Sequence, residues 1–270
     1  MKFNVVTEDH LQQVLQTKFF GRTAYTFQAI DSTNRFAKKI AVQGAQDGTL
    51  VYAEKQSSGY GRRQNKWSSP SGQGLWFSVV LKPVMEADSF SLLTLLGVTS
   101  VAMAVEKHIQ AKLQVKWPND LLINKKKLAG ILVETNMSGQ KAQYAVLGIG
   151  INVNQEMDDF PRDIQNSATS LKIAGWPRIN RTLLLSDILF QLEKDYYHSQ
   201  SKGFDFVLSR WITRSSVLNQ NVGIRVNGRI LHGKVTRFHA KGDLVLVLPG
   251  GREERVSDGT IVEVSNDSGY

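Results

Sequence analysis

The chain has 270 residues, of which 41% are hydrophobic and 21% are charged, and this ordinary balance argues against wholesale disorder. The length suits one large domain, or a large domain accompanied by a small one. A formal net charge of +9 favours anionic partners such as nucleotides, nucleic acid or an acidic protein.

Cysteine is absent, which excludes disulfides, thiolate metal sites and cysteine nucleophiles. Glu8 and Asp9 stand where a secretory signal would need an apolar core, so no export signal is expected. The most apolar window, residues 90–105, is shorter than the roughly 20 residues of a membrane span and contains Ser and Thr, so it predicts a buried helix. We therefore expect a soluble, cytoplasmic protein without a membrane partner.

Helical and strand patterns are mixed over the first two hundred residues. Four good N-cap residues stand in a row at Asp31–Asn34, and Phe36, Ala37 and Ile40 follow on one helical face. In chain order, the patterns predict a helix at 7–18, a strand at 25–30, a helix after Asp31, strands at 49–53 and 75–81, a helix at 89–110, strands at 115–117, 120–123, 128–134 and 144–151, and an amphipathic helix at 182–199.

The pattern changes near residue 219. Val222, Ile224 and Val226 alternate up to Asn227-Gly228, which is a strong hairpin signal. Evenly spaced short strands predict a small β-barrel. Further strands are predicted at 230–238, 244–248 and 256–264, and we place a boundary near residue 217, giving domains 1–217 and 218–270.

A glycine- and arginine-rich stretch follows the predicted strand at 49–53. Its two glycines permit φ > 0 and a close approach of the backbone to a ligand. Two arginines and a lysine beside that backbone suit phosphates or a carboxylate. A solvated hairpin tip has the same composition, so both interpretations remain open at this point. The residues concerned are Gly59, Gly61, Arg62, Arg63 and Lys66.

The second polar motif is the segment Lys116–Asp120, followed by Lys127–Gly130. Asn119 and Asp120 carry oxygen atoms at the end of a strand, where they can help to hold Mg²⁺ bound to phosphates. Lys127 opens the next strand, and a hairpin could return its ammonium to the same place. A solvated lysine turn is the alternative.

The third motif places Gly148 and Gly150 alternately in a predicted strand, with Asn152 and Asn154 after them. Alternate glycines weaken a strand and usually indicate that another group approaches closely. The two asparagines project to the same face. A bulge or a tight sheet crossing is the alternative.

Several common kinds of site are absent from the sequence. There is no Walker-type phosphate loop, no H-E-x-x-H and no G-x-S-x-G, and the five histidines are scattered. Gln64 stands where the third glycine of a dinucleotide-binding loop belongs, which argues against that class.

Taken together, the three motifs resemble those of biotin protein ligases. The resemblance implies an α+β fold: a mixed β-sheet with flanking helices, like that of class II aminoacyl-tRNA synthetases, and a C-terminal SH3-like β-barrel. It covers roughly residues 25–265 and rests on Gln56 with 59–67, on 116–120 with 127–130, on 148–152, and on the segments 31–34 and 168–171, which occur in the same order.

The resemblance implies that the protein couples biotin to ATP, with Mg²⁺, and forms biotinyl-5′-AMP and pyrophosphate. The biotinyl group then passes to a lysine of a biotin carboxyl carrier protein of a carboxylase. A homodimer is plausible by analogy only.

The same resemblance assigns roles to individual residues. Lys127 and Arg62 would bind the biotin carboxylate and the phosphates, and Asp120 would orient or deprotonate the acceptor lysine, with hydrogen bonding inside its hairpin as the alternative. Packing is the alternative for Trp67. Biotin contacts are implied for Ser32, Thr33, Asn34, Gln56, Gly59, Tyr60, Arg62, Lys127 and Gly130, ATP or phosphate contacts for Gly61, Arg62, Arg63, Lys66, Trp67, Asn119, Lys127 and Asn152, and a role in placing Mg²⁺ through the phosphates for Asn119 and Asn152.

Two features depart from the family pattern. Tyr60 stands where many relatives have arginine and Asn65 replaces another basic residue, so we expect the loop to order less completely around the adenylate. Only thirty residues, with one predicted helix, precede Asp31, so we expect no N-terminal DNA-binding domain, no specific DNA binding and no repressor activity.

Two rival functions follow from the sequence. A lipoate or octanoate ligase of the same superfamily is the nearer one, and the Lys116–Asp120 motif favours biotin over it. A nucleic-acid-binding module is the other, and it would need aromatic residues between basic ones on the barrel strands. Only Phe238 lies beside a basic residue, Arg237, there, which argues against it.

Overall fold

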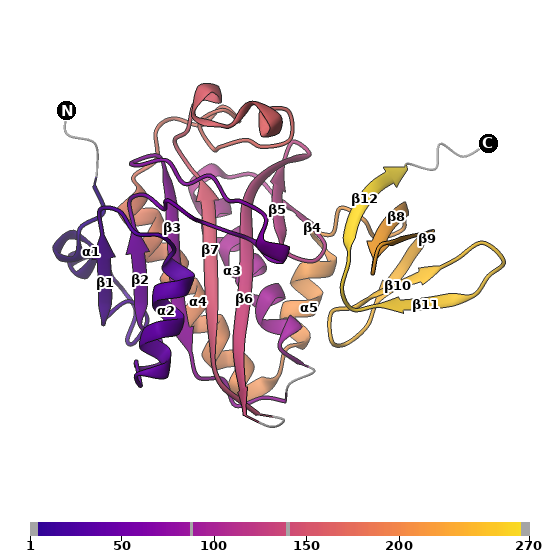
Figure 1. Cartoon of the computed structure of the whole chain (residues 1–270), viewed down its shortest axis with the longest axis horizontal. Helices are drawn as coiled ribbons and strands as arrows, with labels where there is room; N and C mark the ends of the chain where they lie inside the picture. The colour runs from indigo at the N-terminus through magenta and orange to yellow at the C-terminus, as the bar shows by residue number, and fades with distance from the viewer. Residues whose placement is uncertain (1–4, 87–88, 139–140, 266–270) are drawn as a thin grey trace.

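The computed structural model describes residues 5–86, 89–138 and 141–265, so the first four residues of the N-terminal segment lie outside it. A seven-stranded mixed sheet forms its centre (Figure 1). β1 and β2 pair in parallel, and each other neighbouring pair in this sheet is antiparallel. The strands are β1 (Ala24–Phe27), β2 (Leu50–Ala53), β3 (Gly74–Leu81), β4 (Gln114–Lys116), β5 (Asp120–Ile123), β6 (Lys126–Ser138) and β7 (Lys141–Asn152), in the order β1-β2-β3-β7-β6-β5-β4.

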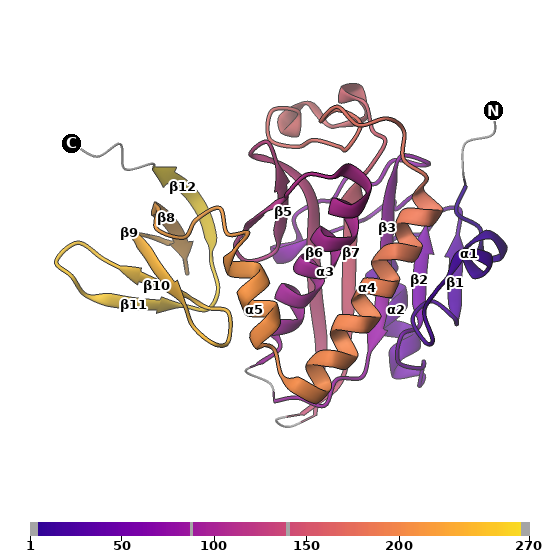
Figure 2. The same ribbon diagram turned by 180° about the vertical axis from the view of Figure 1, so that it is seen from behind.

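Helices cover both faces of this sheet. Helix α2 (Thr33–Val42) lies on one face, and α3 (Ser91–Ile109) and α4 (Arg181–Lys202) lie on the other (Figure 2). Helix α1 (Glu8–Val14) packs near α4 and β1, and α5 (Asp205–Ile212) packs against α3. The predicted α+β class, a mixed sheet with flanking helices, is confirmed.

The alternation of side chains along the strands divides the interior into two parts. Phe77 and Val79 of β3 and Ile149 of β7 point into the main core beneath α3 and α4. Val80 and Val146 point to the opposite face, into a smaller core beneath α2. That smaller core occupies only part of the α2 face, and the remainder of the face carries the polar pocket described below.

Helix α3 is the apolar segment that was expected to be buried. Within the described part of the chain it is the one helix long and apolar enough to cross a membrane by length and composition. However, 72% of its most apolar window is buried inside the protein. This agrees with the predicted core helix.

A second, antiparallel sheet follows α5 and is consistent with the predicted SH3-like domain. Asn227 and Gly228 form its first turn with φ values of 48° and 81°, as the hairpin signal predicted. Its strands are β8 (Asn221–Val226), β9 (Arg229–Phe238), β10 (Leu244–Val247), β11 (Glu253–Val256) and β12 (Thr260–Ser265), in the order β11-β10-β9-β8-β12. The boundary near residue 217 stays a prediction.

The single strand predicted at 256–264 was wrong. The segment divides into β11 and β12, which lie at opposite edges of the second sheet. Ser257, Asp258 and Gly259 separate them, and all three are residue types that favour turns. This turn extends towards the main sheet and becomes part of the candidate site.

Contacts outside that turn also hold the second sheet against the first domain. The Trp117 indole donates a hydrogen bond to the Gly242 carbonyl at 3.0 Å. The rings of Trp211 and Phe238 meet edge to face, with centroids 4.2 Å apart. The second sheet therefore lies beside α5 and next to the β4–β5 turn (Figures 1 and 2).

Candidate active site

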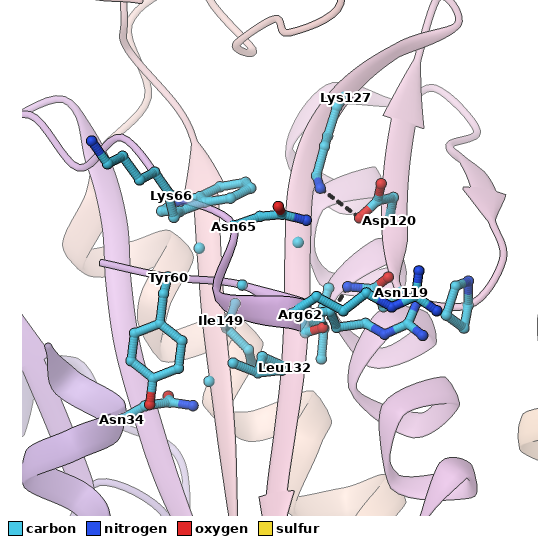
Figure 3. A pocket seen from close by; sticks show the side chains of 18 of the residues that line it. Asn34, Tyr60, Arg62, Asn65, Lys66, Asn119, Asp120, Lys127, Leu132 and Ile149 are labelled. Atoms are coloured by element: carbon cyan, nitrogen blue, oxygen red, sulfur yellow. Dashed lines mark hydrogen bonds and ion pairs between the residues drawn. The ribbon is translucent and has the colours of Figure 1, made fainter. Parts of the chain in front are cut away.

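A cavity of about 170 Å³ lies over the part of the sheet that α2 leaves open. Residues from α2, from the 59–67 loop, from β5, β6 and β7, and from the start of β12 line it. Figure 3 shows the polar side chains that converge there. Both sheets of the protein therefore contribute to one pocket.

Glycines form the floor of this cavity. Gly148 and Gly150 alternate on β7, and Gly130 of β6 pairs directly with Gly150. A Cβ at Gly148 would lie 2.0 Å from Asn34 Oδ1, and one at Gly150 would lie 2.4 Å from Trp67 Nε1. The close approach that the alternate glycines predicted is therefore confirmed, and the approaching groups are side chains of the protein itself. The Trp67 indole packs on this floor, which supports the packing alternative for that residue.

The polar end of the pocket is the start of α2. Ser32 caps the helix and accepts a hydrogen bond from Arg35 N at 3.5 Å. Thr33 donates from its backbone N–H and its hydroxyl to Gln56 Oε1, at 2.9 and 3.1 Å. The Gln56 amide donates in turn to Ser69 Oγ at 3.0 Å. These bonds hold the side chains that were predicted to bind biotin in fixed positions.

A chain of buried and partly buried hydrogen bonds continues from this helix start across the sheet. Ser78 donates its hydroxyl to Asn34 Oδ1 at 2.6 Å, and Asn34 Nδ2 donates to Glu134 Oε2 at 2.9 Å. The Glu134 carboxylate also accepts hydrogen bonds from Lys38 Nζ and from the Tyr60 hydroxyl, each at 2.7 Å. Sequence analysis missed Ser78 and Glu134, although Glu134 follows Gly130 and Leu132 in the two-residue alternation of β6.

These contacts shift the protonation equilibria of the cluster. Burial by itself raises the pKa of Glu134, but hydrogen bonds from Lys38, Asn34 and Tyr60 and the Lys38 charge outweigh it, so the net pKa is lowered. Burial and the Glu134 carboxylate raise the pKa of Tyr60, which stays a neutral hydrogen-bond donor. Burial lowers the pKa of Lys38, but Glu134 outweighs it and the net pKa is raised. Lys38 and Glu134 therefore both stay charged near neutral pH.

The loop 59–67 closes on itself at the mouth of the pocket. Gly61 N donates to Asn65 O at 2.8 Å, and Trp67 N donates to Gly59 O at 2.9 Å. The residues with φ > 0 in this loop are Arg63 (56°) and Gln64 (59°), and the two glycines, which permit this conformation, do not adopt it. Gly59 is needed for another reason, because a Cβ there would lie 2.9 Å from Gln56 Nε2 and from Trp67 O.

Both arginines of the loop contact the turn between β11 and β12. Asp258 forms ion pairs with Arg62 and with Arg63, the latter at 3.1 Å. Arg62 Nη1 also donates to the Gly259 carbonyl at 3.2 Å, and Arg63 Nη1 donates to Thr260 Oγ1 at 2.9 Å. The second sheet thus holds the two predicted phosphate-binding cations. Nothing in the local sequence of Asp258 indicated this role.

Lys127 and Asp120 meet on the opposite wall. The Lys127 ammonium lies 2.7 Å from Asp120 Oδ1, as the dashed line in Figure 3 marks, and 5.2 Å from the Trp67 ring centroid. The predicted return of this lysine by a hairpin is therefore confirmed. The Lys127 backbone is fixed as well, since its N–H donates to Ser167 O at 2.8 Å and its carbonyl accepts from Thr169 N at 2.9 Å.

The two asparagines expected near the metal lie in different places. Asn119 lines the pocket and donates through Nδ2 to the Ile131 carbonyl at 2.9 Å. Asn152 is buried and is not among the lining residues. Its amide donates to the Thr169 carbonyl at 2.9 Å and accepts from Gln155 Nε2 at 3.0 Å. Asn152 therefore stabilises the segment after β7, and this corrects its expected phosphate and metal role.

Most of the predicted site residues are brought together. Lys66 lines the pocket but is exposed, and its side chain extends away from the Lys127–Asp120 pair (Figure 3). Gly59 supports the loop without lining the cavity. The predicted residues that line it are Ser32, Thr33, Asn34, Gln56, Tyr60, Gly61, Arg62, Arg63, Lys66, Trp67, Asn119, Asp120, Lys127 and Gly130, and the lining residues that sequence analysis did not propose include Lys116, Leu132, Thr260 and Ile261.

Comparison with known proteins shows the family of the chain. Residues 26–152 match the biotin/lipoate A/B protein ligase family. The bifunctional ligase/repressor BirA of Bacillus spizizenii is 34% identical over 241 residues, which cover 89% of this chain and 74% of that protein. The chain belongs to the biotin/lipoate A/B protein ligase family.

Other similar proteins match this ligase over a length that includes both of its sheets. The biotin–[acetyl-CoA-carboxylase] ligase of Paracoccus denitrificans is 29% identical over 230 residues, covering 83% of this chain and 93% of that protein. The biotin protein ligase from Aquifex aeolicus, solved in complex with biotin and ATP, superposes with a TM-score of 0.76 at 27% identity. That match covers 90% of this ligase and all of the Aquifex chain. The resemblance to biotin protein ligases inferred from the motifs is confirmed.

Proposed function

We propose that this ligase activates biotin with ATP as biotinyl-5′-AMP and transfers the biotinyl group to a lysine of a biotin carboxyl carrier protein. The observation that carries the proposal is one pocket with two chemically different ends. Hydrogen-bonding groups on Thr33 and Gln56 lie at one end, and the cations Arg62 and Lys127 lie towards the other. The relatives named as biotin ligases support the same assignment.

The polar end suits a neutral ring with several hydrogen-bonding atoms. Ser32, Thr33, Asn34 and Gln56 would bind the ureido ring and tail of biotin there. The glycine floor with the Trp67 indole above it offers an apolar surface for the rest of the molecule. Tyr60 and Gly130 line the same cavity.

The cationic end suits the reacting groups. A carboxylate that attacks a triphosphate must overcome repulsion between like charges, and fixed cations reduce that repulsion. Lys127 would bridge the biotin carboxylate and the α-phosphate, and Arg62, Arg63 and Lys66 would hold the remaining phosphate charge. These cations act without a protein nucleophile, in agreement with the absence of cysteine.

Mg²⁺ would reach the site with the phosphates of ATP. Among the described residues no group of three or more His, Cys, Asp or Glu side chains could hold a metal ion. Asn119 fits a supporting role because it lines the pocket and its Nδ2 bond leaves the side-chain oxygen as an acceptor. When bound, Mg²⁺ would neutralise phosphate charge, and the Asn119 side-chain oxygen would help to hold it.

The position of Asp120 supports a role in the second half-reaction. It lies next to Lys127 in the pocket, where an acceptor lysine must approach the activated carbonyl. We infer that Asp120 orients or deprotonates that lysine. A cytoplasmic location, the absence of specific DNA binding and a homodimer belong to the same proposal.

A transfer assay tests this function. The protein is incubated with Mg²⁺, ATP, biotin and a biotin carboxyl carrier domain, and the carrier mass is measured. We expect a gain that corresponds to one biotinyl group on the native carrier and none on a carrier whose target lysine is changed to arginine. An unmodified native carrier, with active ligase from a known source as the positive control, would contradict the proposal.

A further inference from the structure

The 59–67 loop carries most of the cations of the pocket, yet four consecutive residues of it are exposed. Arg63, Gln64, Asn65 and Lys66 face solvent, and the hydrogen bonds inside the loop fix its shape without fixing its position over the sheet. Its position depends on side chains that reach other elements. Trp67 packs on the glycines of β6 and β7, and the two arginines reach the turn between β11 and β12. Tyr60 is the loop side chain that joins α2 to β6.

Tyr60 is anchored by a charged acceptor. Its hydroxyl donates to Glu134 Oε2 at 2.7 Å, and Glu134 stays ionised because Lys38 Nζ lies 2.7 Å from its other oxygen. A hydroxyl bound to a carboxylate makes a stronger hydrogen bond than one bound to a neutral acceptor. The ring gains two further contacts, since Arg35 and Lys38 of α2 lie 5.2 and 5.9 Å from its centroid, within the range of cation–π attraction.

The anchor also connects the loop to the biotin end of the pocket. Asn34 donates to the same Glu134 oxygen that receives Tyr60, at 2.9 Å. Figure 3 shows the Tyr60 side chain extending down to Asn34, away from the Lys127–Asp120 pair. The Tyr60 hydroxyl is therefore engaged with Glu134, on the side of the pocket away from Lys127, where we propose that the biotin carboxylate reacts. In this position it is poorly placed to act in the chemical step.

We propose that Tyr60 is a positioning residue whose bond to Glu134 latches the 59–67 loop over the pocket before ligands bind, and that this latch slows release of the biotinyl adenylate. The inference rests on the proposed function for its second part only. A loop that is already ordered does not have to be immobilised when the ligand binds. If the latch opens, the population of the competent loop falls and apparent affinity falls by the same factor.

The latch also changes the expected effect of having tyrosine instead of arginine at position 60. We expected the loop to order less completely because Tyr60 replaces a frequent cation. The Glu134 bond and the two α2 cations supply a different attachment at the same position. Arginine at position 60 could pair with the same carboxylate, so the two residues are alternative ways to hold the loop.

The test compares Tyr60→Phe with Tyr25→Phe. The first removes the hydroxyl and keeps the ring, while the second makes the same change in an exposed tyrosine that packs edge to face on Phe36, outside the pocket. The first rate is that of trypsin cleavage after Arg62, Arg63 and Lys66 in the ligand-free protein, which reports loop opening. The second is the rate at which the adenylate dissociates from the protein after gel filtration has removed free ligands. For Tyr60→Phe we expect both rates to rise about ten-fold, the effect of losing a hydrogen bond to a charged acceptor, while Tyr25→Phe should leave both rates unchanged.

Two further variants separate the latch from a general loss of structure. Tyr60→Arg should restore slow release of the adenylate, which is the readout for this variant because the new arginine is itself a trypsin site. In a Glu134→Gln background, Tyr60→Phe should add little to either rate, because the partner has already been weakened. Unchanged cleavage in Tyr60→Phe, or a collapse of the adenylation rate with unchanged release, would overturn the proposal. The cleavage measurement uses no ligand, so a wild-type protein that forms no biotinyl adenylate would contradict the proposed function while leaving the latch testable.

Discussion

The ammonium of Lys127 lies 2.7 Å from the carboxylate of Asp120, across the turn that joins β5 to β6. Asn124 and Lys125 form this turn with φ values of 49° and 63°. The pairing places a cation beside a carboxylate, for which we propose the role of general base, at the cationic end of the pocket. It is the arrangement that activation of a carboxylate followed by attack of an amine requires.

The first prediction concerns Lys127. Changing it to alanine should lower biotinyl-adenylate formation on the order of 10²–10³-fold, because a preorganised cation at the developing charge is lost. Lys126→Ala is the matched control, since it removes the neighbouring lysine of the same strand and should leave the rate within about two-fold. Single-turnover formation of the adenylate measures both. A nearly normal rate in Lys127→Ala would mean that it is only a lysine of the turn.

The return of Lys127 to Asp120 could be predicted from the sequence. The β-bulge that turns the Lys127 side chain towards the pocket could not. Leu128 and Ala129 are consecutive residues, and both are buried in the main core. The β5–β6 register shifts between Leu121 and Leu122, so a bulge absorbs the extra residue. With regular alternation, Lys127 would share the core-facing side with Ala129. A bulge depends on packing between strands, which the local pattern does not encode.

Asp258 is predicted to support the phosphate cations from the second sheet. Asp258→Ala should raise the KM for ATP about five-fold, since exposed ion pairs contribute up to about 1 kcal/mol. Glu263→Ala changes an exposed acidic residue of the adjoining strand β12 and should leave the KM unchanged. Initial rates of pyrophosphate release measure the effect. Equal KM values in the two variants would show that Arg62 and Arg63 do not need this contact.

The contact of Asp258 with the loop arginines could not be predicted from motifs. The motifs located the loop and the β4–β5 turn because their residues are adjacent in sequence. Asp258 lies almost two hundred positions from Arg62 and joins it only through the packing of the second sheet. Glu134 is similar, because its hydrogen bonds to Asn34 and Tyr60 also span long separations. Long-range partners of this kind become visible only in the folded chain.

Gly150 is predicted to be indispensable for the pocket floor. Gly150→Ala places a Cβ 2.4 Å from the Trp67 indole nitrogen, so the indole must move. We expect adenylation to fall by about 10²-fold, as displacement of groups around a reacting centre can do. Combining it with Trp67→Phe, which frees space, should cost less stability than the sum of the two changes. Strict additivity in urea unfolding would contradict the proposed clash.

A buried ion pair joins Glu54, which follows β2, to Arg181 at the start of α4 and should contribute strongly to stability. Arg181 and Glu54 pair at 3.0 Å with exposed side-chain fractions of only 2% and 3%. Glu54→Ala leaves Arg181 without its counter-charge and should lower the free energy of unfolding by about 3–5 kcal/mol. The exposed Lys172–Glu156 pair is the control, and Glu156→Ala should cost at most about 1 kcal/mol. Equal losses of unfolding free energy in Glu54→Ala and Glu156→Ala, measured by urea unfolding, would contradict this prediction.

Glu134 should make stability depend on pH in the acidic range. Its pKa is lower in the folded state than its ordinary value, so its contribution is present above the ordinary carboxyl pKa. That contribution is lost as pH falls through the folded pKa. The stability difference between the wild type and Glu134→Gln should therefore be constant near neutrality and shrink below about pH 5. A difference that does not change down to pH 3 would contradict the assignment.

The choice of acid tests the central claim most directly. The protein is incubated with Mg²⁺, ATP and an equal mixture of biotin, lipoate and octanoate, and acyl-adenylates are identified by mass spectrometry. We predict biotinyl-5′-AMP as the dominant product in the wild type and its loss in Lys127→Ala. Lipoyl- or octanoyl-AMP as the dominant product would contradict the account and assign the pocket to the other branch of the family.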